Sequence, residues 1–217
     1  MTNKADFPSD EAMEGAAWLL MCKVNAIKAV AAVEAGPLGA FHDGGEPVIL
    51  FERHKMLKHV PETKGLSLPE AEVVLLRMSY KDALLSWPRY GGYGPTRVQH
   101  TKLAFAAKRN RTSALKACSW GLFQILGENH EQAGFPVLQR FVNAMYRSVD
   151  DHLRAFTMFV RHDRRLVDAI RAIGEANSDE ELIAAARAFA RPYNGPKYEE
   201  GKYHLKIAAS FKALEVA

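Results

Sequence analysis

Cysteine is scarce in the 217-residue sequence, which contains only Cys22 and Cys118. Neither residue belongs to a CxxC pair, and neither lies in a motif typical of a nucleophilic cysteine, so the sequence gives no sign of thiol catalysis. Both lie in apolar segments that predict helices. We therefore expect two buried free thiols, as in a reducing compartment, and regard a disulfide between them as the less favoured alternative.

Long hydrophobic runs are also absent. No apolar stretch reaches the roughly 20 residues that a membrane-spanning helix needs. The N-terminal sequence MTNKADFPSDEAMEG is too polar for a secretory signal. The expectation is a protein that is made in the cytoplasm without a signal peptide.

Several nucleotide and hydrolase motifs are missing, including GxGxxG, the P-loop and GxSxG. The composition is that of a folded domain, with 48% hydrophobic and 25% charged residues. A net charge of +4 suits an anionic polymer or surface, and by itself it would suit nucleic acid equally. No helix shows a recognisable DNA-reading motif, so we expect no nucleic-acid partner.

Helical periodicity dominates the chain. Ser9 or Asp10 can cap a first helix, a break near residues 22–24 separates it from a second helix ending at Glu34, and Gly36-Pro37 stops that helix. Further helices are predicted over residues 69–86, 96–109, 112–117, 120–127, 135–147, 149–161, 163–174, 179–190 and 199–214. One strand is predicted, VILF, after the turn at Asp43-Gly44-Gly45. The expected fold is mainly α, a single domain with a small β-hairpin.

A lone carboxylate, Glu34, ends the apolar helix segment VAAVEAG at residues 30–36. Breaking a glycosidic bond requires a carboxylic acid that is still protonated near neutral pH, and burial against apolar side chains raises the pKa of a Glu into that range. Ala35-Gly36 leaves room for a sugar. A solvated Glu at a helix C-terminus is the alternative, although its charge would oppose the helix dipole.

A second carboxylate, Glu52, lies in the string LFERH. If the strand alternates, Glu52 shares a face with Val48 and Leu50. Facing Glu34 across a groove, it would stabilise an oxocarbenium-like transition state or activate water. A structural ion pair with Arg53 or His54 is the equally weighted alternative, and Asp43 is a third, weaker candidate for the second acid.

Polar residues occur within two later apolar segments of the sequence. In CSWGLFQIL at 118–126, Ser119 and Gln124 flank a glycine, and in RPYNGPKY at 191–198, Tyr193 and Asn194 precede a Gly-Pro break. Their side chains can hydrogen-bond sugar hydroxyls and acetamido groups. The Tyr193 hydroxyl could instead bond Glu34, with Asn194 bonding a sugar. Ordinary packing and a plain turn are the alternatives.

Metal-ligating residue types occur close together at His42, Asp43, Glu52 and His54. Their spacing matches no zinc or calcium pattern, so we predict neither a metal nor another cofactor.

Basic residues cluster at Lys108, Arg109 and Arg111 and again over residues 161–165. Such clusters are usually solvated helix faces, and the functional alternative is attraction to anionic wall polymer or to outer-membrane headgroups. The segment 202–214 alternates basic and apolar positions. We expect it to pack on the core rather than to disturb a membrane.

The order of four strings, AIKAVAAVEAG, FHDGGEPVILFERHKM, CSWGLFQILGENH and FARPYNGPKY, resembles the N-acetylmuramidase domain of phage endolysins. The resemblance runs from about Asp6 to Leu214. It implies a lysozyme-like fold and cleavage of the β-1,4 bond from N-acetylmuramic acid to N-acetylglucosamine. Many family members carry a separate wall-binding module in front, but too few residues precede the helix of Glu34 for one. We therefore expect a single catalytic domain over residues 1–217, acting as a monomer. Glu34 falls at the family's catalytic position. Family members often carry Ser where this chain has Ala35, and Ala where it has Cys118.

The resemblance also implies peptidoglycan glycan strands as the substrate, reached in the periplasm after release from the cytoplasm. Three alternatives stand beside the hydrolase. A lytic transglycosylase needs one Glu and forms a 1,6-anhydro product, and Glu52 favours hydrolysis over it. A non-enzymatic wall- or membrane-binding protein would not depend on Glu34, and a basic nucleic-acid binder would show salt-sensitive affinity.

Overall fold

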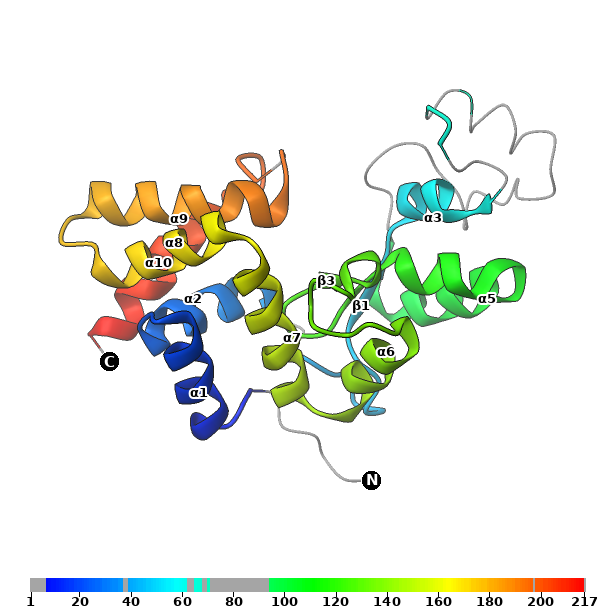
Figure 1. The fold of residues 1–217 in the computed structure, drawn as a ribbon, viewed down its shortest axis with the longest axis horizontal. Coiled ribbons are helices and arrows are strands. Elements are labelled where there is room, and N and C mark those ends of the chain that lie inside the picture. The colour runs from blue at the N-terminus through cyan, green and yellow to red at the C-terminus, as the bar shows by residue number, and fades with distance from the viewer. Residues whose placement is uncertain are drawn as a thin grey trace.

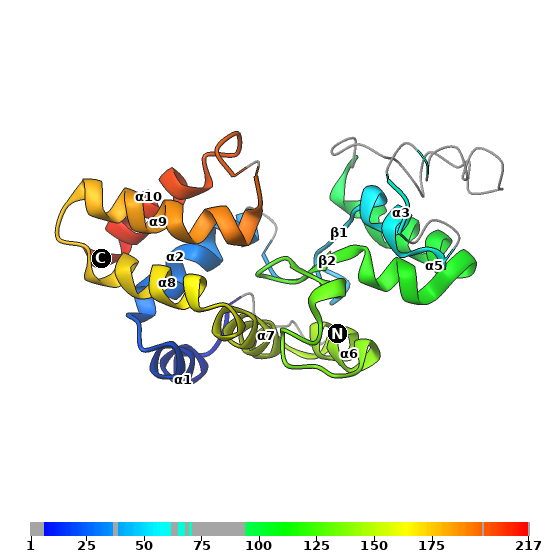
Figure 2. The same ribbon diagram turned by 45° about the horizontal axis from the view of Figure 1, so that its top comes forward.

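The computed structural model describes residues 7–36, 39–61, 65–67, 70, 94–196 and 198–216. Both views of the ribbon show a group of helices on one side of the molecule (Figures 1 and 2). We call them the helical lobe: α1 (Asp10–Leu20), α2 (Val24–Ala35), α8 (Arg164–Glu175), α9 (Asp179–Asn194) and α10 (Tyr203–Glu215).

The opposite side, which we call the sheet lobe, holds a small sheet and further helical elements (Figure 1). They are β1 (Ile49–Phe51), α3 (Arg53–His59), η3 (Thr96–Val98), α5 (Gln99–Lys116), β2 (Cys118–Trp120), β3 (Ile125–Leu126) and η4 (Gly127–Asn129). Helix α6 (Leu138–Arg147) covers this lobe, and α7 (Val149–His162) runs between the two sides (Figure 2). The mainly α fold is therefore confirmed.

The start of the chain follows the predicted pattern. The Ser9 hydroxyl accepts a hydrogen bond from the Ala12 amide at 3.3 Å and caps α1. Met21 ends α1 in the left-handed region with φ +52°, and α2 begins at Val24, so the predicted break is confirmed. Gly36, also at φ +52°, ends α2 directly after the turn that carries Glu34.

The C-terminal helix packs on the core, as expected for the segment 202–214. Its buried residues His204, Ile207, Ala208 and Phe211 lie on the face that meets α2 and α9. The preceding helix α9 is longer than predicted, because it continues through Pro192 to Asn194 instead of ending at residue 190. This extra turn carries Tyr193 and Asn194 towards the end of α2.

The predicted helix over residues 120–127 is wrong. Gly121 and Gln124 have φ of +68° and +48°, which reverses the chain so that Trp120 pairs with Ile125 in an antiparallel hairpin. A short apolar run fits a buried strand as well as a helix, and periodicity alone does not separate them. The sheet order is β1-β2-β3, with Leu50 opposite Ser119.

The predicted turn at residues 43–45 forms, with the Gly45 amide donating to the His42 carbonyl at 2.7 Å. Strand β1 nevertheless finds its partner far along the chain, in β2, while only an isolated bridge joins Phe41 and Pro47. The small β-element is therefore a three-stranded sheet built from two distant segments.

Helix α5 merges the two helices predicted over 96–109 and 112–117. The backbone leaves the helical region at Asn110, with φ −150° and ψ 102°, and its side chain caps the second half by accepting from the Ser113 amide at 2.9 Å. Helix α3 was not predicted. The helix predicted over residues 69–86 lies outside the described residues.

Both thiols are free, as predicted, although only Cys118 is fully buried and Cys22 is partly exposed.

Within the described residues no single helix is long and apolar enough to cross a bilayer. Helices α1 and α2 would meet such a test only as a pair, and they are bent by 110° at their junction.

Candidate active site

A cleft of about 880 Å³ is lined by residues from both lobes. The helical lobe contributes the ends of α2 and α9, and the sheet lobe contributes β1, the start of α3 and the β2–β3 hairpin. All six predicted site residues line this cleft: Glu34, Glu52, Ser119, Gln124, Tyr193 and Asn194. Asp43 is exposed in its turn and is not part of the cleft lining.

Glu34 occupies the last turn of α2 and is only partly exposed. Its carboxyl oxygen Oε1 accepts a hydrogen bond from the Asn194 amide nitrogen Nδ2 at 2.7 Å. Burial raises the pKa of Glu34 from 4.5 to about 7, and the Asn194 hydrogen bond opposes this rise without cancelling it. The carboxyl group therefore retains its proton close to neutral pH.

The hydroxyl of Tyr193 does not bond Glu34, which corrects one of the expectations above. It donates to the Phe123 carbonyl at 2.6 Å and so ties the end of α9 to the β2–β3 turn. The residue that contacts Glu34 is Asn194, the next along the helix. Burial, followed by the nearby charge of Glu34, raises the pKa of Tyr193 well above its usual value, so its hydroxyl keeps its proton.

Glu52 lies on the opposite wall, between the end of β1 and the first turn of α3. Its Oε1 accepts from the Ser119 hydroxyl at 2.8 Å, so Ser119 orients a carboxylate. Burial raises the pKa of Glu52, and the Ser119 hydrogen bond and the charge of Lys55 act in the opposite direction. Both carboxyl groups in the cleft thus differ from a solvated Glu.

His54 approaches Glu52, with 3.4 Å between Nε2 and Oε2. This is the contact expected of a structural ion pair. Burial, together with the charges of Lys55 and Lys58, lowers the pKa of His54 to about 4. The ring is therefore neutral at pH 7, and the contact lacks the charge of an ion pair.

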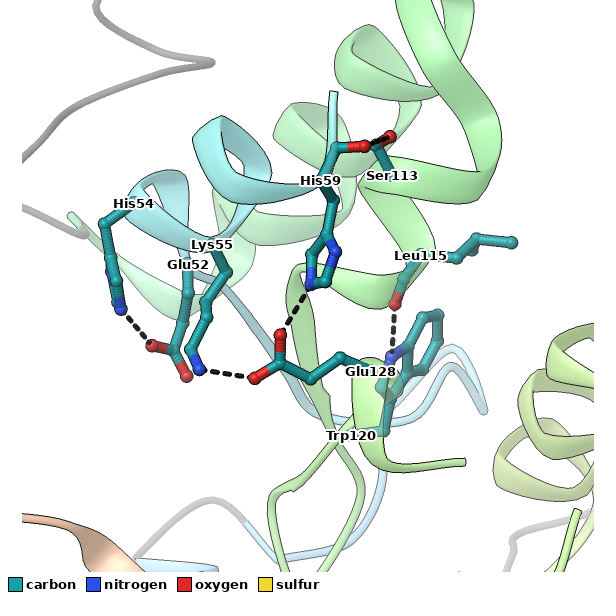
Figure 3. Close-up of polar contacts among 8 residues, drawn as sticks. All are labelled: Glu52, His54, Lys55, His59, Ser113, Leu115, Trp120 and Glu128. Atoms are coloured by element: carbon teal, nitrogen blue, oxygen red, sulfur yellow. Dashed lines mark hydrogen bonds and ion pairs between the residues drawn. The ribbon is translucent and has the colours of Figure 1, made fainter. Parts of the chain in front are cut away.

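Three residues that sequence reasoning missed form a charged network beside Glu52 (Figure 3). Glu128, in η4, contacts the Lys55 amine and lies 2.5 Å from the His59 ring nitrogen Nε2. Burial would raise the pKa of Glu128, but these hydrogen bonds and charges outweigh it and lower the pKa to about 2. Glu128 and Lys55 both line the cleft.

Side chains that donate to backbone carbonyls hold together the elements that carry this network. The Ser113 hydroxyl donates to the His59 carbonyl at 2.7 Å, and the Trp120 ring nitrogen donates to the Leu115 carbonyl at 3.2 Å (Figure 3). The only sequence signal for the network was the crowding of ionisable residues in FERHKMLKH, with nothing to point to Glu128.

Gln124 faces the cleft from the β2–β3 turn. Its amide nitrogen donates to the Gly121 carbonyl at 2.7 Å, so this half of the side chain stabilises its own turn.

Among the described residues, no group of three or more His, Cys, Asp or Glu side chains is arranged to hold a metal ion.

A model of the N-acetylmuramidase family matches residues 23–215, which include every residue of the site described above. The chain belongs to the N-acetylmuramidase family. Its fold is similar to the crystal structure of the Burkholderia AP3 phage endolysin, with a TM-score of 0.77 and 29% sequence identity over 99% of this chain and 74% of that one. No curated protein sequence matches the chain significantly. This N-acetylmuramidase is thus a peptidoglycan-cleaving glycoside hydrolase at the family level, with the fold of a phage endolysin.

Proposed function

We propose that the protein cleaves the β-1,4 bond between N-acetylmuramic acid and N-acetylglucosamine, with Glu34 as the general acid. The observation that carries this proposal is a carboxyl group that lines the cleft and has a pKa of about 7. A general acid works best when its pKa lies near the operating pH, because it is then both protonated and able to release its proton.

In this mechanism Glu34 gives its proton to the glycosidic oxygen as the bond to the anomeric carbon breaks. Positive charge develops on the sugar ring in the transition state. Glu52, from the opposite wall, is the second carboxylate. In its ionised form, which the neighbouring Lys55 favours, it stabilises that charge or takes a proton from the attacking water.

The four polar residues predicted to bind substrate divide into two groups in the proposed mechanism. Ser119 and Asn194 act through the carboxyl groups that they contact. Tyr193 and Gln124 shape the cleft through backbone carbonyls. Direct contacts to the sugars then fall to other polar residues of the lining, among which Asn129 and Tyr203 are suitable.

A lytic transglycosylase is the second candidate, and one observation favours it. Burial raises the pKa of Glu52, and a protonated Glu52 would be a poor base for water. A transglycosylase needs only one acid, because the muramic acid 6-hydroxyl replaces water as the nucleophile. The products would then carry a 1,6-anhydro ring.

The test is digestion of purified peptidoglycan by wild type, Glu34→Gln, and the matched variant Glu14→Gln, which alters an exposed carboxylate on α1. Loss of clearing in Glu34→Gln alone supports the assignment, and full activity in Glu34→Gln refutes it. Mass spectrometry of the wild-type products distinguishes the two reactions, since the anhydro product is one water lighter than the hydrolysed product.

For its biological setting, we propose that the chain is made in the host cytoplasm and reaches periplasmic peptidoglycan after release. We expect it to act as a monomer, with contact to the anionic outer-membrane surface as a secondary interaction. Sedimentation of the purified protein, alone and with anionic vesicles, tests both expectations.

A further inference from the structure

The side-chain contact between Asn194 and Glu34 has a geometry that matters for proton transfer. Its Nδ2 lies 2.7 Å from Oε1 of Glu34. Its carbonyl oxygen Oδ1 is buried and has no hydrogen-bond partner within the described part of the chain. Among the described residues, the bond from Nδ2 to Glu34 is therefore the protein contact that orients this side chain.

The donor on Asn194 distinguishes the two oxygens of the Glu34 carboxyl group. An oxygen that accepts a short N–H···O bond is disfavoured as the site of the acidic proton, because an O–H group would meet the N–H hydrogens. The proton of the neutral acid is therefore directed to Oε2. When the proton leaves, Oε1 gains negative charge and the same hydrogen bond becomes charge-assisted and stronger.

We propose that Asn194 is a positioning residue for the general acid, which places the proton on Oε2 of Glu34 and stabilises the carboxylate that forms as the proton is transferred. This inference rests on the proposed role of Glu34. An interaction that strengthens during the reaction lowers the barrier to the chemical step, whereas it contributes little to substrate affinity.

The position of Asn194 is set from both lobes. It is the last residue of α9, immediately before Gly195, whose φ of +75° turns the chain away from the helix. The preceding Tyr193 anchors this turn of the helix to the Phe123 carbonyl at 2.6 Å. The amide is thus held between α2 and the hairpin of the sheet lobe.

The other titratable groups around Glu34 do not compete for this role. Tyr193 of α9 and Tyr203 of α10 are the groups whose pKa values the charge of Glu34 raises after the effect of burial, so both stay neutral at pH 7. Glu52, Lys55 and Glu128 belong to the opposite wall of the cleft.

The charged groups that reach α2 from other helices meet it nearer its beginning. Asp10 of α1 lies 3.8 Å from the Lys28 amine, and Glu215 of α10 accepts from Asn25 at 2.7 Å. Among the residues that the structure describes, Asn194 is the side chain that hydrogen-bonds Glu34.

The test measures the pH dependence of kcat and kcat/KM for wild type, Asn194→Ala and Asn194→Asp on soluble glycan fragments. In Asn194→Ala the carboxylate loses its donor, so we expect kcat to fall about tenfold with KM nearly unchanged. The alkaline limb of the profile, which reports ionisation of Glu34, should move upward by about half a pH unit to one unit. A limb that stays in place with an unchanged kcat would overturn the inference.

Asn194→Asp keeps the shape of the side chain and guards against a simple folding defect. Its carboxylate cannot donate when ionised and repels the charge of Glu34, so the alkaline limb should move further upward and kcat should fall more than in Asn194→Ala. The matched control is Asn143→Ala, which removes an exposed asparagine of α6 outside the cleft. It should leave the limb where it is in wild type.

Glu34→Gln separates this inference from the proposed function. If Glu34→Gln is active, the proposed function fails. If Glu34→Gln is inactive while both Asn194 variants keep the wild-type profile, only the role of Asn194 is wrong. Circular dichroism and thermal unfolding of each variant show whether the fold is retained.

Discussion

The two carboxyl groups of the cleft, Glu34 and Glu52, belong to the same residue type but have different hydrogen-bond partners and different nearby charges. Burial raises the pKa of both. Glu34 ends an apolar helix, and its hydrogen-bond partner is a neutral amide. Glu52 accepts from Ser119 and lies beside Lys55, whose charge favours the ionised form. This difference favours Glu34, whose partner is neutral, as the proposed acid.

The segment that follows Glu52 also differs in charge from the rest of the sequence. Residues 53–117 contain 13 Lys and Arg against 4 Asp and Glu, while the rest of the sequence contains 16 against 21. Helices α3 and α5, on the side of Glu52, contain no acidic residue. A positive environment stabilises a carboxylate, so it favours an ionised group on the Glu52 side of the cleft.

The strongest test of the difference between Glu34 and Glu52 is to remove each carboxyl group in turn. Glu34→Gln should lower the rate of peptidoglycan hydrolysis by about a thousandfold, because no proton donor remains for the leaving oxygen. Turbidity loss of purified peptidoglycan measures it. A rate within tenfold of wild type would show that the acid lies elsewhere.

Glu52→Gln should have a smaller effect, about a hundredfold, because the glutamine keeps the Ser119 contact but can neither carry charge nor accept a proton from water. The rate and the mass of the products are measured together. If the variant keeps the wild-type rate and both enzymes release anhydro products, Glu52 is not a catalytic group and the transglycosylase is correct.

The positions of these two residues differ in how well the sequence could predict them. Glu34 follows from local signals, namely the apolar face of its helix and the glycine that ends that helix. Its actual partner could not be predicted, because Tyr193 and Asn194 are adjacent on a helix and point about 100° apart. Which of them faces α2 depends on how α9 crosses that helix, and this is a tertiary property.

The surroundings of Glu52 depend still more on long-range contacts. Ser119 reaches Glu52 because β1 pairs with β2, and Glu128 reaches Lys55 and His59 because the hairpin folds back towards α3. The apolar string around Ser119 was compatible with a helix, so neither contact was visible in the sequence. Periodicity predicts which face of an element is buried, but not which distant segment covers it.

A third prediction concerns the free energy of unfolding and tests the burial of Glu34. The pKa of Glu34 is about 7 in the folded protein and near 4.5 when unfolded, so the unfolded chain releases this proton first as pH rises. The associated stability is fully present below about pH 4.5 and is lost as the pH rises through 7. Glu34→Gln, which carries no charge, should therefore be more stable than wild type at pH 8, by up to about 3 kcal/mol.

Urea unfolding at pH 4 and pH 8 measures this difference, with Glu14→Gln as the control for an exposed carboxylate. The two proteins should have similar stability at pH 4, and Glu14→Gln should show no gain at pH 8. Equal stability of wild type and Glu34→Gln at pH 8 would mean that Glu34 is solvated, and its assignment as the acid would lose its physical basis.

The smallest expected effect tests the charged network beside Glu52. Glu128 raises the pKa of Glu52 and also engages the Lys55 amine, so Glu128→Gln should remove one unfavourable charge and free Lys55 to interact with Glu52. Both changes lower the pKa of Glu52, and the acidic limb of the pH–rate profile should shift downward by less than about one unit. Glu131→Gln, an exposed neighbour outside the cleft, should leave the limb unchanged. An upward shift in Glu128→Gln would show that Lys55 stabilises Glu52 only while Glu128 holds it in place, so that the two walls of the cleft differ in preorganisation as well as in charge.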